Sequence, residues 1–452
     1  MRHRRHRLGL GLALTILIGV AGPERGRGDV SPTTGEEDVL IERGDLQQLV
    51  AAAEPGATLL LRRGQYQGPV TIETPVTIRG EPGTVISGDG RGSVIEIVAD
   101  DVRLERLIIR RSGRDLSKDD AGILVLGDRA VLKDLVLREN LHGVYLLSAE
   151  EARLSGLEII GLAATEEEPE VIGADAVDSD HMHHSPPTTQ SLMGNGIHLF
   201  DADGATVEGN YIHHVRDGIY VAHTNRARIE RNRIHDSRYG IHYMYSSDNL
   251  IADNELWGNV AGPALMFSRN LEVRKNSMYD HSGFRAYGLL LQNVDASRFT
   301  ANEIRANRVG MRLQNSSANE FRRNRLTGNL LGMTMNSSSR DNLLTRNEFG
   351  VNLRQIGLTG PVPPTDWAED GVGNEWSDAL PLDLTGDGVS EWPHHEVDLL
   401  AERRERFPEV ELLVGSMGIK IVEWALRKAP IPGMRYITDP HPLVNHRVKE
   451  RG

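Results

Sequence analysis

NYIHHVRDGIYVAHTNRARIER (residues 210–231) is followed directly by NRIHDSRYGIHYMYSSDNLIAD (residues 232–253), and the two stretches align position by position. Each begins with asparagine, a variable residue and isoleucine, and Asn-x-apolar recurs along the chain in steps of 22, 22, 22, 26, 22 and 23 residues. The asparagines of this column are Asn210, Asn232, Asn254, Asn276, Asn302, Asn324 and Asn347. A period of this length indicates a solenoid of stacked repeats.

A second column, glycine followed by an apolar residue, has the same period and comprises Gly196, Gly218, Gly240, Gly288, Gly310 and Gly332. Short alternating apolar runs between Asn, Gly, Asp and Ser clusters indicate strands joined by turns. Leucine-rich repeats have a similar period, but their Leu-x-x-Leu-x-Leu spacing is absent. The columns therefore predict an all-β fold, a right-handed parallel β-helix in which the asparagines stack and hydrogen-bond the backbone and one another.

The pattern divides the chain into six predicted segments. Residues 1–22 are expected to be a signal peptide, 23–44 a flexible segment, and 45–58 an N-terminal cap with a short helix. The β-helix is predicted over 59–352, with an insertion at 163–195. Residues 353–395 are expected to form a Pro/Gly/Asp-rich connecting loop, and 396–452 a helical C-terminal segment. Caps are expected because the open ends of a solenoid expose unpaired strand edges.

The leader and the overall charge restrict the function classes. A basic stretch at residues 2–7 precedes a short apolar run at 8–22, the pattern of a secretory signal peptide. The formal charge is -13 and becomes more negative once the leader's arginines are removed. An acidic surface disfavours nucleic acid as a partner. The chain has no cysteine, so thiolate metal ligands are excluded and a soft metal must use histidine and methionine.

Three short motifs distinguish this solenoid from others. They are RYGIHYMYS at residues 238–246, GNEWSD at 373–378 and PIPG at 430–433. With these motifs the chain resembles the NosD family, periplasmic maturation proteins of nitrous oxide reductase, over nearly the whole mature sequence. The resemblance implies a periplasmic, non-enzymatic protein that assists copper delivery and copper–sulfide cluster assembly in the reductase.

The implied partners are an ABC transporter permease and ATPase of the NosY and NosF types, a copper chaperone and nitrous oxide reductase. Membrane association would come through the transporter. Two alternatives stay open: a secreted polysaccharide-active enzyme (lyase, hydrolase or epimerase) and a purely structural scaffold. Polysaccharide cleavage needs positioned carboxylates and a base, whereas Asp217, Asp236, Asp248 and Asp280 occur in turn-like segments without a compact acid–base pair.

Soft donors recur at the coil period on the face that alternation points outward. If Ile241 enters the core, His242 and Met244 face out, and parallel coils place equivalent residues about 4.8 Å apart. The predicted copper site, for Cu(I), comprises His198, His242, Met244 and Met266. Thioether and imidazole suit Cu(I). The competing interpretation is that these side chains only stabilise coil against coil.

Three further groups are candidates. The insertion supplies an alternative copper site at His181, Met182, His183 and His184, unless it is a solvated surface loop. A second ladder, His213, His235, Trp257 and Tyr279, is expected to contact a partner. Met417 and Trp424 belong to a C-terminal helical pattern that caps the solenoid or docks on the permease.

The loop at residues 383–391 is a candidate calcium site. Asp383, Asp387 and Glu391 offer alternate oxygen ligands around Gly386 and Gly388. Thr385 stands where a further carboxylate would strengthen the site, and the family's usual loop carries more aspartates. The alternative is a rigid turn in which the side chains bind the backbone.

Overall fold

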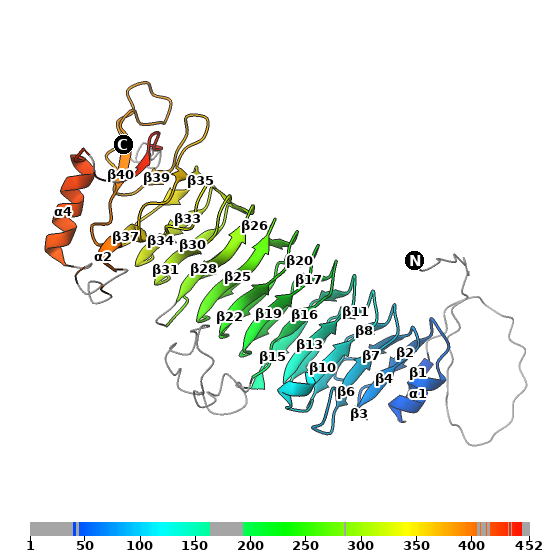
Figure 1. The fold of residues 1–452 in the computed structure, drawn as a ribbon. Coiled ribbons are helices and arrows are strands. Elements are labelled where there is room, and N and C mark those ends of the chain that lie inside the picture. Colours follow the sequence, from blue (N-terminus) through cyan, green and yellow to red (C-terminus); the bar gives the residue numbers. More distant parts are fainter. Residues whose placement is uncertain are drawn as a thin grey trace, which may run out of the picture.

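The fold is known from a computed structural model, which describes residues 39–41, 45–162, 193–283, 286–404, 407, 413, 416–432, 434 and 436–444. The described chain winds through three parallel sheets, A, B and C, that form the sides of an elongated solenoid (Figure 1). The predicted parallel β-helix is confirmed. The predicted signal peptide at 1–22 and the His181–His184 group lie outside the described residues.

Sheet A has 14 strands in the order β1 (Val39–Ile41), β2 (Thr58–Leu61), β5 (Thr77–Gly80), β8 (Arg103–Glu105), β11 (Val131–Lys133), β14 (Arg153–Ser155), β17 (Thr206–Glu208), β20 (Arg228–Glu230), β23 (Leu250–Ala252), β26 (Glu272–Arg274), β29 (Arg298–Thr300), β32 (Glu320–Arg322), β35 (Asn342–Thr345) and β38 (Thr365–Asp366). Sheet B has 13, namely β3 (Gln65–Gln67), β6 (Val85–Ser87), β9 (Ile108–Arg110), β12 (Val136–Arg138), β15 (Glu158–Ile160), β18 (Tyr211–His213), β21 (Arg233–His235), β24 (Glu255–Trp257), β27 (Ser277–Tyr279), β30 (Glu303–Arg305), β33 (Arg325–Thr327), β36 (Glu348–Phe349) and β39 (Glu375–Trp376).

Sheet C has 12 strands: β4 (Val70–Ile72), β7 (Ile95–Ile97), β10 (Ala121–Val125), β13 (His142–Leu147), β16 (Ile197–Phe200), β19 (Asp217–Ala222), β22 (Tyr239–Met244), β25 (Ala261–Arg269), β28 (Tyr287–Asp295), β31 (Val309–Gln314), β34 (Leu331–Asn336) and β37 (Arg354–Thr359). The remaining elements are α1 (Leu46–Ala52), η1 (Leu116–Lys118), α2 (Ala401–Arg404), α4 (Met417–Lys428) and the antiparallel pair β40 (His394–Glu396) and β41 (Ile437–Asp439).

The asparagine column forms the predicted ladder. Asn232 Nδ2 donates to Asn254 Oδ1 at 3.0 Å and to the carbonyl oxygen of Val207 at 2.9 Å. The residue before each asparagine of this column adopts a positive φ, as Arg231 does at 55°. A left-handed residue costs about 1–2 kcal/mol, and the buried amide bonds of the ladder offset that cost. The ladder thus fixes both the turn and the register of every coil.

The glycine column is required by close packing between coils. A Cβ atom on Gly218 would lie 2.3 Å from Ile234 Cγ2 and 2.5 Å from the carbonyl oxygen of Gly240. Any side chain there would force adjacent coils apart. The gap of 53 residues between Val144 and its register partner Ile197 leaves this packing unchanged on both sides.

The N-terminal end carries a short helix. Asp45 caps α1 by accepting a hydrogen bond from the Gln48 amide. Gln47 then exchanges two hydrogen bonds with the backbone of Thr71 on β4, the N-terminal edge strand of sheet C, at 3.2 and 2.7 Å. A side-chain amide therefore satisfies part of the open edge of that sheet.

Two predicted boundaries at the C-terminal end are wrong. The coils continue past residue 352 to Trp376, because Asn374 extends the ladder by accepting from Asn347 Nδ2 at 2.9 Å. Its step of 27 residues departs from the regular period. The segment 396–452 is not uniformly helical either, since β41 pairs with β40. Asp439 of β41 accepts from the Asn374 amide nitrogen and from Trp376 Nε1, which ends the ladder with a carboxylate.

Candidate functional site: a buried histidine row on sheet C

Sheet C carries a row of rings on its outer face. His198 of β16, Tyr220 of β19 and His242 of β22 are consecutive register partners. The ring centroids of His198 and Tyr220 lie 4.5 Å apart, and those of Tyr220 and His242 lie 4.9 Å apart, both edge to face. We call these three residues the sheet C histidine row. The row was expected to be exposed, but His242 is only 8 % exposed because Tyr239 and Tyr220 pack against its ring.

A buried carboxylate determines the tautomer of His242. The Nδ1 atom of His242 lies 3.0 Å from Asp217 Oδ2, and a carboxylate can only accept there. Asp217 also binds Arg238 through two contacts of 2.9 and 2.6 Å. With Nδ1 protonated, His242 Nε2 carries a free lone pair. A histidine that donates its other N–H to a carboxylate is the usual arrangement of a metal-binding imidazole.

The charges around Asp217 are mutually stabilising. Burial raises the pKa of Asp217, but the charge of Arg238 and the hydrogen bond from His242 outweigh that effect and leave the pKa below its ordinary value. The pKa of Arg238 changes in the opposite direction. Burial lowers it, but the pairing with Asp217 outweighs burial and leaves the pKa above its ordinary value. Arg238 and His242 therefore favour the ionised form of Asp217. The sequence analysis mentioned Asp217 only as one of several carboxylates in turn-like segments, so it missed the role of this residue in the histidine row.

Two methionines lie next to the row. Met244 is two residues beyond His242 on β22, hence on the same face, and Met266 of β25 is its register partner. The Tyr220 hydroxyl donates to Met244 Sδ at 3.5 Å, so Tyr220 contacts both His242 and Met244. Both methionines are partly exposed. Imidazole and thioether donors side by side form a soft set that fits Cu(I).

His142, beside the row, and His198, within it, both use Nδ1 as an acceptor. His142 Nδ1 accepts the backbone N–H of Asn195 at 3.0 Å, so its proton sits on Nε2 and the ring has no free lone pair. His198 Nδ1 lies 3.3 Å from Asn195 Nδ2, which can only donate, so the proton of His198 also sits on Nε2, a buried nitrogen without a hydrogen-bond partner. Burial lowers the pKa of His142 to about 4 and that of His198 to about 3. Both rings are neutral near pH 7.

Sheet B carries the second predicted ladder, which we call the sheet B ring stack. Its register partners His213, His235, Trp257 and Tyr279 stack nearly parallel, with interplanar angles of 6°, 23° and 12°. Arg305 continues the stack, its guanidinium carbon 3.9 Å from the Tyr279 centroid. His235 has both nitrogens engaged, with Asp236 at 2.6 Å and the Tyr211 hydroxyl at 2.8 Å. This surface is aromatic but offers no free imidazole nitrogen at His235.

The 383–391 loop binds its own backbone. Asp383 accepts from the amides of Gly386 and Gly388, Asp387 from Val389, and Glu391 from Leu384. These are the bonds of a rigid turn. The three carboxylates do not converge within ligand distance of one another, and the one group of the described residues that does is Asp378, His394 and Glu396.

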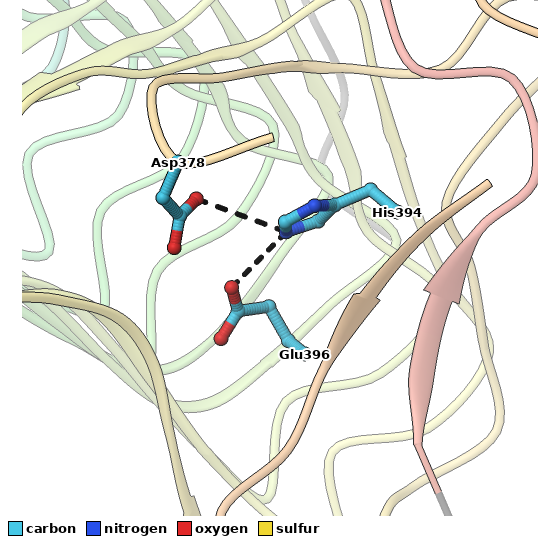
Figure 2. Close-up of side chains that lie close together, drawn as sticks. All are labelled: Asp378, His394 and Glu396. Carbon is cyan, nitrogen blue, oxygen red and sulfur yellow. Dashed lines mark hydrogen bonds and ion pairs between the residues drawn. The ribbon is translucent and has the colours of Figure 1, made fainter. Parts of the chain in front are cut away.

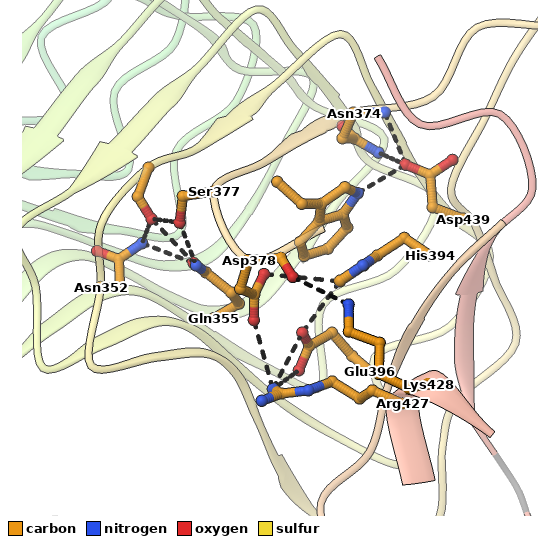
Figure 3. A network of polar contacts seen from close by, with 12 residues as sticks. Asn352, Gln355, Asn374, Ser377, Asp378, His394, Glu396, Arg427, Lys428 and Asp439 are labelled. Carbon is orange, nitrogen blue, oxygen red and sulfur yellow. Dashed lines mark hydrogen bonds and ion pairs between the residues drawn. The ribbon is translucent and has the colours of Figure 1, made fainter. Parts of the chain in front are cut away.

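That group lies at the C-terminal end, and its three residues were not among the site residues predicted from the sequence. Asp378 follows β39, and His394 and Glu396 alternate on β40, so their side chains share one face (Figure 2). His394-x-Glu396 is a weak signal that strand alternation could have revealed. The group sits within a larger polar network that includes Arg427 of α4 and Asp439 of β41 (Figure 3).

Helix α4 is anchored on one face and open on the other. Glu423 is 5 % exposed and pairs with Arg354 of β37, while Arg427 pairs with Glu396. Met417 and Trp424 are 73 % and 57 % exposed, and they lie seven residues apart on one side of the helix. None of the helices in the described part of the chain is long and apolar enough to cross a membrane.

Sheet A holds a charged groove of about 680 Å³. If the chain were a polysaccharide-active enzyme, this groove would be its candidate substrate site. Its lining includes Arg103, Arg129, Arg153, Asp101 and Glu151. The hydrogen bond from Arg129 lowers the pKa of Asp101. An ionised, paired carboxylate of this kind cannot donate a proton to a leaving group, so Asp101 is unsuited to be a general acid.

Comparisons with known proteins bear on the family of this chain and on its fold. Residues 175–380 match the family model described as "Periplasmic copper-binding protein (NosD)". A "Probable ABC transporter binding protein NosD" from Stutzerimonas stutzeri is 35 % identical over 401 residues, which cover 85 % of this chain and 86 % of that protein. A protein of the same name from Pseudomonas aeruginosa is 34 % identical, covering 85 % and 87 % of the two chains.

The chain belongs to the NosD family. NosD is described as periplasmic and copper-binding, and the relatives are named as binding proteins rather than enzymes. Among solved structures, the surface adhesin PfbA of Streptococcus pneumoniae has a TM-score of 0.50 at 10 % identity, covering 73 % of this chain and 85 % of the adhesin. A family 28 exopolygalacturonase from Yersinia enterocolitica reaches 0.49 at 12 % identity, covering 75 % and 80 %. Similarity at this level concerns the fold alone.

Proposed function

We propose that this NosD family member holds Cu(I) on the sheet C histidine row as cargo, and passes it on for assembly of the copper–sulfide cluster of nitrous oxide reductase. The observation that carries the proposal is His242. Its Nδ1–H is donated to Asp217, and its Nε2 lone pair is free. Met244 lies two residues further along the same face of β22, and Met266 is the register partner of Met244. The copper-binding description of the family supports the same cargo.

The donor set favours transfer over permanent storage. Thioethers bind Cu(I) without the charge of a thiolate, so the ion is held less tightly than in a cysteine site. Met244 and Met266 are partly exposed whereas His242 is buried, so the methionines face an incoming donor or acceptor protein. His198 lies next to Tyr220 in the row, but Asn195 Nδ2 donates to its Nδ1, so its Nε2 carries a proton and His242 is the imidazole that offers a lone pair.

The test is a Cu(I) titration against a chromophoric chelator under reducing conditions. Replacing Met244 and Met266 together by leucine keeps the volume nearly constant while removing both sulfurs. We expect Cu(I) affinity to fall at least tenfold, whereas Met417→Leu, a matched change on α4, should leave it unchanged. If the double variant binds as wild type and His181→Ser/His183→Ser/His184→Ser does not, the copper site lies in the insertion instead.

The family's transporter names support a second part of the proposal, in which the chain docks on an ABC transporter whose permease and ATPase are of the NosY and NosF types. We place the docking on the open face of α4, at Met417 and Trp424, because the opposite face is held by Arg354 and Glu396. A copper chaperone and the reductase would then meet the chain away from this helix.

Replacing Met417 and Trp424 by serine should abolish co-purification with the transporter while leaving the β-helix folded. Val351→Ser, which changes another strongly exposed apolar residue, is the control. Point variants are preferable to truncation, since removing the C-terminus also removes Asp439 from the end of the asparagine ladder. Normal co-purification of the double variant would move the docking surface to the sheet B ring stack.

A further inference from the structure

The C-terminal end holds a compact set of hard donors that the copper proposal does not use. His394 Nε2 lies 3.0 Å from Glu396 Oε1 and 3.9 Å from Asp378 Oδ1, and all three ligand atoms lie within 4.8 Å of one another (Figure 2). Residues His394 and Glu396 are 6 % and 2 % exposed. Asp378 Oδ1 is buried and has no hydrogen-bond partner, although it points toward the imidazole nitrogen.

We propose that Asp378, His394 and Glu396 bind a divalent transition metal of the zinc type. Zinc–nitrogen and zinc–oxygen bonds of about 2.0–2.2 Å place tetrahedral ligands about 3.3–3.5 Å apart. The two observed separations from Nε2 fall on either side of that value, so shifts of about half an ångström would seat the ion. The ion would take the place of the proton that Nε2 donates to Glu396 Oε1, and that proton would be released to solvent. One imidazole and two carboxylates without sulfur suit Zn²⁺ rather than Cu(I).

The surroundings orient the imidazole. His394 stacks on Trp376 with ring centroids 4.6 Å apart and an interplanar angle of 26°. Trp376 in turn donates its indole N–H to Asp439 at 2.8 Å, so the ring that stacks on the histidine is itself fixed. Such support of a ligand ring by neighbouring groups is typical of metal sites.

The charge balance explains how the site persists without metal and what the metal would change. Arg427 NH1 lies 3.3 Å from Glu396 Oε2 and 3.4 Å from Asp378 Oδ2. Lys428 Nζ also lies 3.4 Å from the carbonyl oxygen of Asp378, so two cations balance the two carboxylates in the absence of metal. A divalent ion would be attracted by Asp378 and Glu396 and repelled by Arg427. The metal would link the end of the last coil to β40. Because Arg427 of α4 contacts both carboxylates, metal binding would also change the contacts of this helix.

Calorimetric titration of Zn²⁺ into the metal-free full-length chain tests the site. The chain should carry His181→Ser/His183→Ser/His184→Ser, which removes the histidine cluster of the insertion. We expect one zinc per chain, with affinity lowered at least tenfold by Asp378→Asn and abolished by His394→Gln. Asp387→Asn, in the neighbouring exposed loop, should bind zinc as the parent does. Unchanged titrations for Asp378→Asn and His394→Gln would overturn the proposal.

A gain-of-affinity variant guards against loss through misfolding. Arg427→Met removes the competing charge and should tighten Zn²⁺ binding several-fold, an effect that a damaged fold cannot produce. Weaker binding by this variant would contradict the charge argument. The result is also independent of the copper proposal: Met244→Leu/Met266→Leu should retain zinc binding, and Asp378→Asn should retain Cu(I) affinity.

Discussion

His242 on sheet C and His235 on sheet B both place Nδ1 against a carboxylate, but they differ in the burial of that carboxylate and in the partner of Nε2. His242 meets Asp217 at 3.0 Å and His235 meets Asp236 at 2.6 Å. The Asp217 side chain is 1 % exposed and bound to Arg238, whereas that of Asp236 is 51 % exposed. His235 Nε2 is also occupied by the Tyr211 hydroxyl, while His242 Nε2 has no hydrogen-bond partner among the described residues.

The difference shows what the coil period does and does not specify. Stacking at the coil period aligns rings on both sheets equally well, because parallel register depends only on the backbone. Whether an aligned histidine can bind an ion depends on its second nitrogen, and that is determined by residues outside the ladder. The sheet C histidine row is therefore suited to an ion, and the sheet B ring stack to a flat partner surface.

The largest effect is expected from Asp217→Asn. It leaves the buried Arg238 without a counter-charge, a loss that typically costs about 3–5 kcal/mol. We expect the free energy of unfolding in urea to fall by about that amount, and Cu(I) affinity to fall with it because His242 loses its carboxylate partner. A loss below about 1 kcal/mol with full Cu(I) affinity would show that the two ladders are equivalent.

Trp257→Ala should have an intermediate effect confined to the sheet B ring stack. It removes the ring between His235 and Tyr279, two aromatic contacts worth about 0.5–1.5 kcal/mol each beyond their buried area. We expect a loss of about 2 kcal/mol in the same urea experiment, with Cu(I) affinity unchanged. Reduced Cu(I) binding would mean that the two sheets are coupled through the core.

The pH dependence of stability should also differ between the histidines of sheet C and those of sheet B. Burial lowers the pKa of His142 to about 4 from an ordinary 6.5, so the unfolded chain takes up the proton more readily below pH 6.5. Its contribution to stability is complete above pH 6.5 and is lost as the pH falls toward 4, at up to about 1.4 kcal/mol per pH unit. Melting temperatures between pH 6.5 and 4.5 should fall less steeply for His142→Asn than for wild type.

His213 provides the matched measurement on sheet B. Burial and the neighbouring His214 and His235 lower its pKa to about 4 as well, but its side chain is partly exposed and solvent screens the effect. His213→Asn should therefore change the pH dependence less than His142→Asn does. Equal changes would indicate that both histidines are equally shielded from water.

The smallest effect is expected from Asp236→Asn. The substitution is chemically the same as Asp217→Asn, but it acts on an exposed carboxylate with no arginine partner among its described contacts. Exposed pairs contribute about 0.2–1 kcal/mol, so unfolding in urea should barely change. A loss as large as that of Asp217→Asn would remove burial as the explanation of the difference.

The periodic parts of the molecule could be predicted from the sequence. Asparagine and glycine columns report backbone geometry directly, because the ladder amides and the missing Cβ atoms are what the coil requires. The positions of His198, His242, Met244 and Met266 on one face followed from the same period. The burial of His242 did not follow, since it depends on how Tyr220 and Tyr239 pack around its ring.

The aperiodic contacts could not be predicted. Asp217 reaches His242 across 25 residues, and Asp439 reaches Asn374 across 65 residues, neither of them a coil step. Asp378 and His394 are brought together only after the coils have ended. Such contacts depend on the direction of side chains and on the path of loops of irregular length, and the repeat period of the sequence predicts neither.

The stacked coils also act as a ruler. Five strand spacings of sheet C separate β22, which carries His242, from β37, whose Arg354 holds α4. At about 4.8 Å each, the proposed copper ligands stand about 24 Å along the rod from the helix proposed to dock on the transporter. The cargo would thus be held at a fixed distance from the docking helix. Deleting residues 303–324, one coil in length, would shorten that distance by about 4.8 Å without altering either end.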